Sequence, residues 1–369
     1  MMHLIQVMPA LPLLLLPTLA AASPALLQSR QFGLPGFGGG AAAGPSTVSI
    51  TLNPSQKFQE IDGFGISEAF QRANGIVNLP EPKRGEVMDL LFNATTGAGL
   101  TIVRNGIGSS QSSANDWMNT FQPDKPASPA AAPTYRWDGK DSGQLWVSKQ
   151  AHERYGVAAF YGNAWSAPGF MKSNGQDSNG GCLCGSPGCS CQSGDWRKAY
   201  AAYLVKYIQL YAGEGVPVTH IGFVNEPDIS TAYASMQVNG QQAADFVAVL
   251  RPALNAANLS HVKIACCEAT GWNVQRTYTQ ALSAVADQMD VITSHEYTSR
   301  ISGTQPTELK VWQTEYSDLS GRWSTAWYSN GGAGDGWTWA NTISNGLTSA
   351  NLNAYLFWEG TQDRATNNK

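Results

Sequence analysis

The chain has 369 residues, of which 43% are apolar, and its formal net charge at pH 7 is −4. A net negative charge argues against nucleic acid or an anionic membrane as a partner. The length suits two domains or one (β/α)8 barrel, because such barrels use roughly 250 residues or more.

The first 46 residues indicate two segments that precede the folded part. Residues 1–22 predict a secretory signal peptide, because the apolar run ALPLLLLPTLAAA ends in small residues and is too short to cross a membrane. Residues 23–46 predict a flexible leader rich in Gly, Ala and Pro. We therefore expect a secreted, extracellular protein whose folded domain is residues 47–369.

Strand patterns alternate with helical patterns from residue 47 onward. A first strand is predicted over residues 47–52, TVSITL. Near-continuous apolar strands follow at 61–66, 100–105, 157–165, 219–225, 262–269, 290–297, 309–316 and 353–359, and helices at 81–92, 144–155, 196–213, 239–256, 273–286 and 335–350. Eight such strands with helices between them predict an α/β fold, a parallel sheet closed as a (β/α)8 TIM barrel.

Function in such a barrel gathers at the C-terminal ends of the strands. The predicted strands carry these polar and aromatic residues there: Arg104, Asn105, Trp165, Asn225, Glu226, Glu268, His295, Tyr297, Glu315, Tyr316, Trp358 and Glu359. Strand ends often carry Ser, Thr or Asp for no functional reason. Repeated Trp, Glu and Arg favour a binding site at this rim.

Two of these glutamates form a candidate catalytic pair. Glu226 ends the fourth strand in NEPD, and Glu315 ends the seventh in TEYSD. Strands that face each other across a barrel can hold two carboxyls about 5–5.5 Å apart, the spacing of retaining glycoside hydrolysis. Asn225 could then bind a sugar 2-hydroxyl. The alternative is that both glutamates only form ion pairs at the rim, with Arg104 and Lys310.

Four stretches together resemble glycoside hydrolase family 30, a family of (β/α)8 retaining enzymes. They are FQEIDGFGISEAF, GNAWSAPGFMKSNG, NEPD and TEYSD, in that order, and the resemblance runs from about Ser46 to the end. The first stretch is most similar to the fungal xylanase branch, which acts on β-1,4-xylan and often on glucuronoxylan. The resemblance implies Glu226 as general acid/base and Glu315 as nucleophile, with no metal or cofactor.

The resemblance also implies supporting and substrate-binding roles around the pair. Arg104 resembles an arginine that contacts the nucleophile and keeps it ionised. The remaining residues resemble those lining the sugar subsite and cleft: Trp165, His295, Tyr297 and Trp358. The alternatives are that the tryptophans belong to the core and that His295 is a rim histidine whose hydrogen bonds are satisfied.

Arg72, in the stretch SEAFQRA, resembles an arginine associated with the 4-O-methylglucuronate branch of xylan. A planar guanidinium can hold a carboxylate through two hydrogen bonds. The alternative is a loop arginine bonded to a helix C-terminus or to Glu68.

Six cysteines and two sequons fit an oxidising, extracellular compartment. Zinc sites favour two or more residues between paired ligands, and here only one intervenes, so disulfides are expected, with three pairings open for the four clustered cysteines. The sequons Asn93-Ala-Thr and Asn258-Leu-Ser are candidate glycosylation sites. The cysteines are Cys182, Cys184, Cys189 and Cys191 in CLCGSPGCSC, and the adjacent Cys266 and Cys267.

These features predict a secreted, monomeric, retaining endo-β-1,4-xylanase acting on glucuronoxylan of plant cell walls. Alternatives within the family are an exo-acting xylanase or xylobiohydrolase, a β-1,6-glucanase or β-1,6-galactanase, and a glucosylceramidase-like hydrolase. An alternative of another class is a non-catalytic carbohydrate-binding protein. Family members usually carry a β-sandwich side domain after the eighth strand, and we expect it to be missing here, which leaves a barrel truncated after that strand.

Overall fold

The structure, a computed structural model, describes residues 49–111, 118–320 and 324–362. Eight parallel strands close into a barrel in sequence order, which confirms the predicted fold. The strands are β1 (Gly63–Ser67), β2 (Ile102–Ile107), β3 (Ala159–Ala164), β4 (His220–Gly222), β5 (Lys263–Ala269), β6 (Val291–His295), β7 (Lys310–Glu315) and β8 (Ala354–Phe357). The predicted signal peptide and leader lie outside the described residues.

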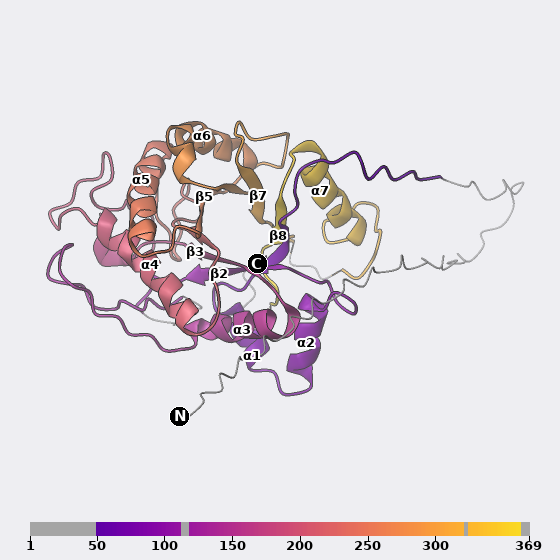
Figure 1. The fold of residues 1–369 in the computed structure, drawn as a ribbon, viewed down its shortest axis with the longest axis horizontal. Helices are drawn as coiled ribbons and strands as arrows, with labels where there is room; N and C mark the ends of the chain where they lie inside the picture. Colours follow the sequence, from indigo (N-terminus) through magenta and orange to yellow (C-terminus); the bar gives the residue numbers. More distant parts are fainter. Residues whose placement is uncertain (1–48, 112–117, 321–323, 363–369) are drawn as a thin grey trace, which may run out of the picture. The chain divides into compact units, whose positions relative to one another are not determined.

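Helices lie outside the ring of strands (Figure 1). Six of them match the predicted helices closely, and the link between β6 and β7 contains no helix. The helices are α1 (Arg72–Val77), α2 (Lys83–Phe92), α3 (Gln144–Tyr155), α4 (Arg197–Gly213), α5 (Gly240–Ala256), α6 (Trp272–Leu282) and α7 (Gly336–Ser349), with short 3-10 segments at Asp141–Gly143, Gly169–Met171 and Ser283–Gln288.

The structure corrects the expected elements at three places. The described part of the stretch 47–52 forms no strand, because no described strand pairs with it and a strand needs a partner for its hydrogen bonds. Strand β4 has three residues instead of the seven expected at 219–225. The short helix α1 was not expected, and it begins after Phe70 and Gln71 adopt left-handed backbone conformations.

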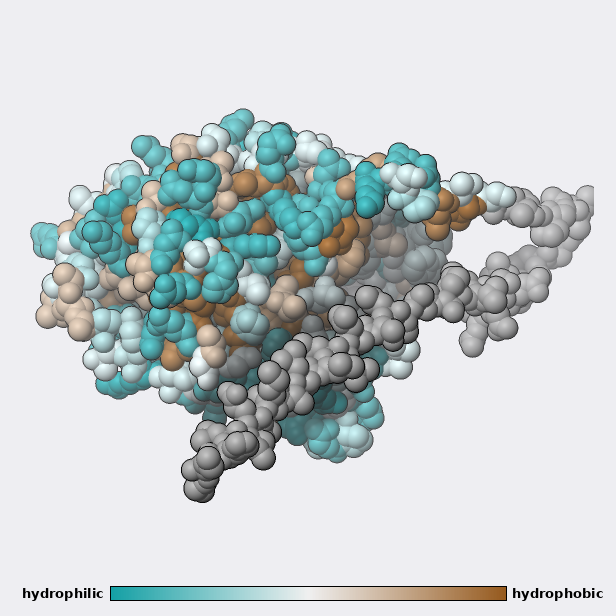
Figure 2. Space-filling view, in the orientation of Figure 1, coloured by the Kyte–Doolittle hydropathy of each residue, from teal (hydrophilic) through white to brown (hydrophobic). Residues whose placement is uncertain are grey.

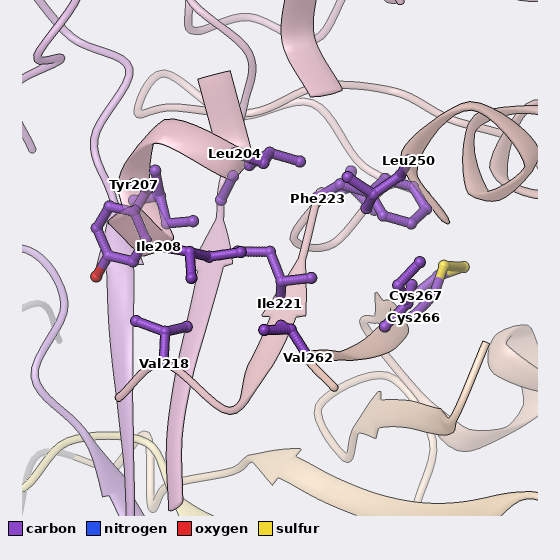
Figure 3. Close-up of a cluster of buried hydrophobic side chains, with 14 of the residues drawn as sticks. Leu204, Tyr207, Ile208, Val218, Ile221, Phe223, Leu250, Val262, Cys266 and Cys267 are labelled. Atoms are coloured by element: carbon purple, nitrogen blue, oxygen red, sulfur yellow. A yellow bond between two sulfur atoms is a disulfide. The ribbon is translucent and has the colours of Figure 1, made fainter. Parts of the chain in front are cut away.

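Two apolar clusters stabilise the barrel. One lies between strands and helices, and Figure 3 shows the part where Ile221 of β4 meets side chains of α4 and α5. The other has side chains from six strands: Ile102, Tyr161, Ala265, Val291, Trp312, Ala354 and Leu356. Side chains alternate across a strand, so Arg104 lies two residues beyond Ile102 on the same face, and His295 lies four beyond Val291. The second cluster is therefore an apolar floor beneath polar residues.

All six cysteines form disulfides, which confirms that prediction. The clustered cysteines pair as Cys182–Cys189 and Cys184–Cys191, and the adjacent pair forms Cys266–Cys267. At the sequons, Asn258 is exposed, whereas Asn93 is half-buried and its side-chain oxygen accepts hydrogen bonds from two following backbone N–H groups.

The surface is predominantly hydrophilic on the face shown in Figure 2, where apolar residues appear between the hydrophilic ones. Among the residues that the structure describes, no helix is both long and apolar enough to cross a membrane.

Three buried ionisable residues meet where β1 and β8 close the barrel. They are Glu68 after β1, Arg72 at the start of α1 and Glu359 after β8. Nε of Arg72 donates to Glu359, whereas neither oxygen of Glu68 has a hydrogen-bond partner among the described residues. Burial and the negative charge of Glu359 raise the pKa of Glu68 to about 8, although Arg72 opposes this.

This raised pKa predicts a pH dependence of stability. A carboxyl that titrates near pH 8 when folded and near 4.5 when unfolded contributes stability below pH 4.5 that is lost as the pH rises through 8. The free energy of unfolding should therefore fall across this window by up to a few kcal/mol, at about 1.4 kcal/mol per pKa unit. Glu68→Gln should flatten the fall, and urea denaturation at several pH values measures it.

The matched control is Glu86→Gln, which removes an exposed glutamate of α2 that pairs with Lys83. It should leave the pH dependence of the wild type in place. An unchanged dependence in Glu68→Gln would show that Glu68 does not cause it.

Candidate active site

The predicted glutamate pair lies at the C-terminal ends of two strands. Glu315 is the last residue of β7, and Glu226 follows β4 with a left-handed backbone, φ 48°. One carboxylate oxygen of each lies within 4.8 Å of the other. Both are nearly buried, with Glu226 8% and Glu315 5% exposed. So close an approach fits the carboxyl spacing of retaining glycosidases, about 5–5.5 Å, better than the roughly 6.5–9.5 Å of inverting ones.

Arg104 is hydrogen-bonded to two carboxylates and one amide of the site. Its Nη1 donates to Glu315 Oε2 at 2.5 Å, and its Nη2 donates to Asn225 Oδ1 at 2.5 Å and to Glu268 Oε2 at 2.7 Å. The ring of Trp165 lies 4.5 Å from the guanidinium carbon. A guanidinium without solvent contact needs such partners, because an isolated buried charge is very unfavourable.

His295 lies between the carboxyl groups. Its Nδ1 is 3.2 Å from Glu226 Oε1, and its Nε2 is 2.9 Å from Glu268 Oε2 and 3.6 Å from Glu315 Oε2. Burial favours the neutral ring, but the three carboxylates outweigh it and raise the pKa of His295 to about 10. The ring is therefore an imidazolium at neutral pH.

Both oxygens of the Glu315 carboxylate have hydrogen-bond donors. Arg104 donates to Oε2, and the hydroxyl of Tyr297 donates to Oε1 at 3.1 Å. Burial raises the pKa of Glu315, while the positive charges of His295 and Arg104 oppose that rise. The carboxylate is thus held in one orientation beside two cations.

Glu226, His295 and Glu315 are also close enough together to hold a metal ion. However, each ring nitrogen of His295 faces a carboxylate oxygen, and both oxygens of Glu315 accept hydrogen bonds. These donors and acceptors already satisfy one another, so we interpret the group as acid–base machinery rather than a metal site.

Aromatic rings form one wall beside Glu226. Trp165 is 1% exposed and packs against Phe70 and Trp358, and Trp358 is half-buried. Tyr233 is 37% exposed, packs on Phe70, and donates its hydroxyl to Glu226 Oε2 at 3.2 Å. Solvent therefore reaches Trp358 and Tyr233, whereas the buried ring of Trp165 packs against the Arg104 guanidinium.

The structure brings four of the predicted supporting residues into direct contact with the glutamate network: Arg104, Asn225, His295 and Tyr297. Lys310, named in the alternative interpretation, pairs instead with Asp62. Arg72 is not in the network. It is 2% exposed, and besides Glu359 it donates to the carbonyl of Phe70, so its guanidinium is held inside the protein.

Sequence reasoning missed two residues of the site. Glu268 was placed at the rim but received no role, and only its position at a strand end pointed to it. Tyr233 lies seven residues after Glu226, and no pattern in the sequence marked it.

Glu268 is fully buried, and although burial opposes ionisation, the charge of Arg104 and the hydrogen bond from His295 lower its pKa to about 2.

Comparison with known proteins identifies the family. A family model described as O-glycosyl hydrolase family 30 matches residues 47–304. Among solved structures, the catalytic domain of GH30 xylanase C from Talaromyces cellulolyticus is 46% identical, with a TM-score of 0.79 over 84% of this chain and 70% of that one.

Curated relatives are more distant and have other names. An endo-1,6-beta-D-glucanase of Neurospora crassa is 27% identical over 68% of this chain and 54% of its own length. A putative glucosylceramidase of Caenorhabditis elegans is 25% identical over 54% of this chain and 37% of its own. The chain thus spans about half of the first of these relatives and less of the second. The family match, together with the barrel and its glutamate pair, shows that this chain belongs to glycoside hydrolase family 30.

Proposed function

We propose that this protein is a secreted endo-β-1,4-xylanase that hydrolyses its substrate with retention of configuration. The observation that carries the chemistry is the pair Glu226 and Glu315, whose oxygens approach within 4.8 Å at the end of the barrel where function gathers. The proposed substrate rests on the 46% identity to a structure named as a xylanase. The disulfides support secretion.

Catalysis would proceed in two displacements. Glu226, protonated, donates its proton to the glycosidic oxygen while the Glu315 carboxylate attacks the anomeric carbon. The bond to the leaving sugar breaks, and a covalent glycosyl–enzyme forms. Glu226, now ionised, removes a proton from water, which attacks the anomeric carbon and releases Glu315.

The surrounding groups prepare both steps. Arg104 and Tyr297 fix the two oxygens of Glu315, so the nucleophile loses little orientational entropy on attack. Asn225 accepts from Arg104 through its oxygen, which leaves its amide N–H groups for a sugar hydroxyl. The accessible rings of Trp358 and Tyr233 supply apolar faces against which a sugar ring can pack.

A second candidate substrate is a β-1,6-glucan, because the curated relative of Neurospora crassa is named as an endo-1,6-glucanase. Both substrates would use the same glutamate pair. The choice between them depends on the loops around the pair, and the structural relative has the higher identity.

Substituting the two glutamates should separate their roles. Glu315→Gln should abolish hydrolysis of xylan and of aryl xylosides, because no nucleophile remains. Glu226→Gln should lower kcat on xylan by about 10²- to 10⁴-fold. It should largely spare formation of the glycosyl–enzyme from an aryl xyloside with an acidic leaving group, since that group departs without a proton. Stopped-flow release of the phenol measures this step.

The control is Glu296→Gln, which removes a buried carboxylate bonded to Tyr355 and to the backbone of Ile301 rather than to a residue of the glutamate network. It should retain wild-type kinetics. Normal xylan hydrolysis by the Glu315→Gln variant would rule out Glu315 as the nucleophile. Proton NMR should show the β-anomer as the first product, and an initial α-anomer would refute retention.

A panel of polymers tests the substrate. Glucuronoxylan, unsubstituted xylan, β-1,6-glucan and β-1,6-galactan are compared by reducing-sugar release and chromatography of early products. An endo-xylanase should release mixed xylo-oligosaccharides first. Xylose or xylobiose alone from the start indicates exo action, and faster cleavage of β-1,6-glucan would replace the proposed substrate. Binding of xylan without release of sugar would indicate a non-catalytic binding protein.

Arg72→Ala tests the predicted recognition of the glucuronate branch. Because Arg72 is buried and paired with Glu359, we expect activity on decorated and bare xylan to fall by the same factor. The ratio of kcat/KM on the two substrates measures this. A loss confined to decorated xylan would instead support the branch-binding role.

A further inference from the structure

Glu268 has a backbone conformation that few residues other than glycine adopt. Its φ is 61°, and the register of β5 against β6 shifts between Cys267 and Ala269. Its carbonyl accepts the backbone N–H of Glu226, which is left-handed as well. Such conformations cost about 1–3 kcal/mol and persist where the surrounding structure imposes them, and bulges near active sites redirect side chains.

This backbone directs the carboxylate of Glu268 into a fully enclosed set of donors. Arg104 Nη2 of β2 donates at 2.7 Å, the Tyr161 hydroxyl of β3 at 2.8 Å and the Thr314 hydroxyl of β7 at 3.0 Å. His295 Nε2 of β6 completes the set at 2.9 Å. The side chain has no solvent contact, so it does not reach a substrate.

The position of the His295 ring then determines which of its nitrogens carry a proton. Its two nitrogens face carboxylate oxygens, Glu268 on one side and Glu226 on the other, and the Tyr297 ring packs perpendicular to it. Only the imidazolium donates from both nitrogens. Its Nδ1–H donates to Oε1 of Glu226, so a proton on Glu226 belongs on Oε2. The Tyr233 hydroxyl, which donates to Oε2 of the ionised carboxylate, then turns to accept that proton's hydrogen bond.

The charges of the buried groups balance in the state that the proposed mechanism needs. Arg104 and His295 are positive, Glu268 and Glu315 are negative, and the sum is zero when Glu226 is protonated. We propose that Glu268 is a positioning residue of the active site. It fixes the orientation and the positive charge of His295, and His295 in turn keeps the proton of Glu226 on the Oε2 atom of Glu226. This inference rests on the proposed roles of Glu226 and Glu315.

Glu268→Gln tests the proposal, because it removes the charge and keeps the size. Loss of a negative charge within about 4–6 Å makes the remaining groups release protons more readily, by about 1–3 pKa units. The pH profile of kcat/KM should therefore shift to lower pH by about one unit or more, with its alkaline limb moving furthest. We expect kcat to fall at least about tenfold and KM to change little.

Two variants serve as comparisons. Glu268→Asp keeps the charge, so it should restore the wild-type position of the profile even if the rate stays low. Glu296→Gln removes a buried carboxyl outside the network and should leave the profile unchanged. If Glu268→Gln lowers the rate without moving either limb, Glu268 is only structural and the proposal is overturned.

A measurement without substrate checks the same point. ¹⁵N NMR of labelled histidine, assigned with His295→Gln, should show His295 of the wild type charged up to about pH 10. It should titrate at lower pH in Glu268→Gln. Titration of wild-type His295 near pH 6.5 would overturn the proposal even if Glu268→Gln fails to fold.

These readouts also separate this inference from the proposed substrate. If xylan is not hydrolysed but another polymer of the panel is, the pH profiles are recorded on that polymer. If no polymer is hydrolysed, the proposed function fails, and the NMR titration still decides the role of Glu268.

Discussion

The buried charge of Arg104 is the constraint on which the rest of the site depends. Transfer of a guanidinium out of water costs several kcal/mol even after relaxation, unless hydrogen-bonded anions surround it. Two carboxylates and an amide oxygen, from Glu315, Glu268 and Asn225, surround it here. Removal of any one partner would leave an N–H group of the buried Arg104 guanidinium without its acceptor, so these residues act as a unit.

That requirement couples distant parts of the chain. The partners of Arg104 come from β5, from β7 and from the loop after β4, so each strand must keep its register for the network to form. The apolar floor below, which includes Trp312 and Tyr161, excludes water from the barrel interior. Exclusion of water strengthens every interaction above it, because the local dielectric is low.

The same network explains how two similar carboxyls can take different roles. Glu315 accepts hydrogen bonds from Arg104 and Tyr297, and the positive charges of Arg104 and His295 oppose the rise in its pKa that burial causes. Glu226 contacts His295 and Tyr233 and does not contact Arg104, and its left-handed backbone turns it away from the strand. The proposed division into nucleophile and acid rests on these different contacts, in the way that carboxyl pairs of glycosidases take their roles from their environments.

The catalytic machinery and the substrate preference have different structural origins. The network lies in and shortly after the strands, whereas the exposed ring of Tyr233 lies in the long loop between β4 and α5. Relatives named as xylanase, glucanase and glucosylceramidase all match this chain. Loops tolerate change better than a closed barrel, so the substrate can vary while the chemistry stays.

The sequence by itself determined the barrel, the eight strand positions and the two glutamates, because apolar periodicity and residues at strand ends are local properties. It also named Arg104, Asn225, His295 and Tyr297. Only the tertiary structure decided that Glu268 joins them, that Tyr233 reaches Glu226, and that Arg72 pairs with Glu359. Those three facts depend on a bulge, a loop path and the closure of β1 on β8, and each brings together residues whose proximity no local pattern encodes.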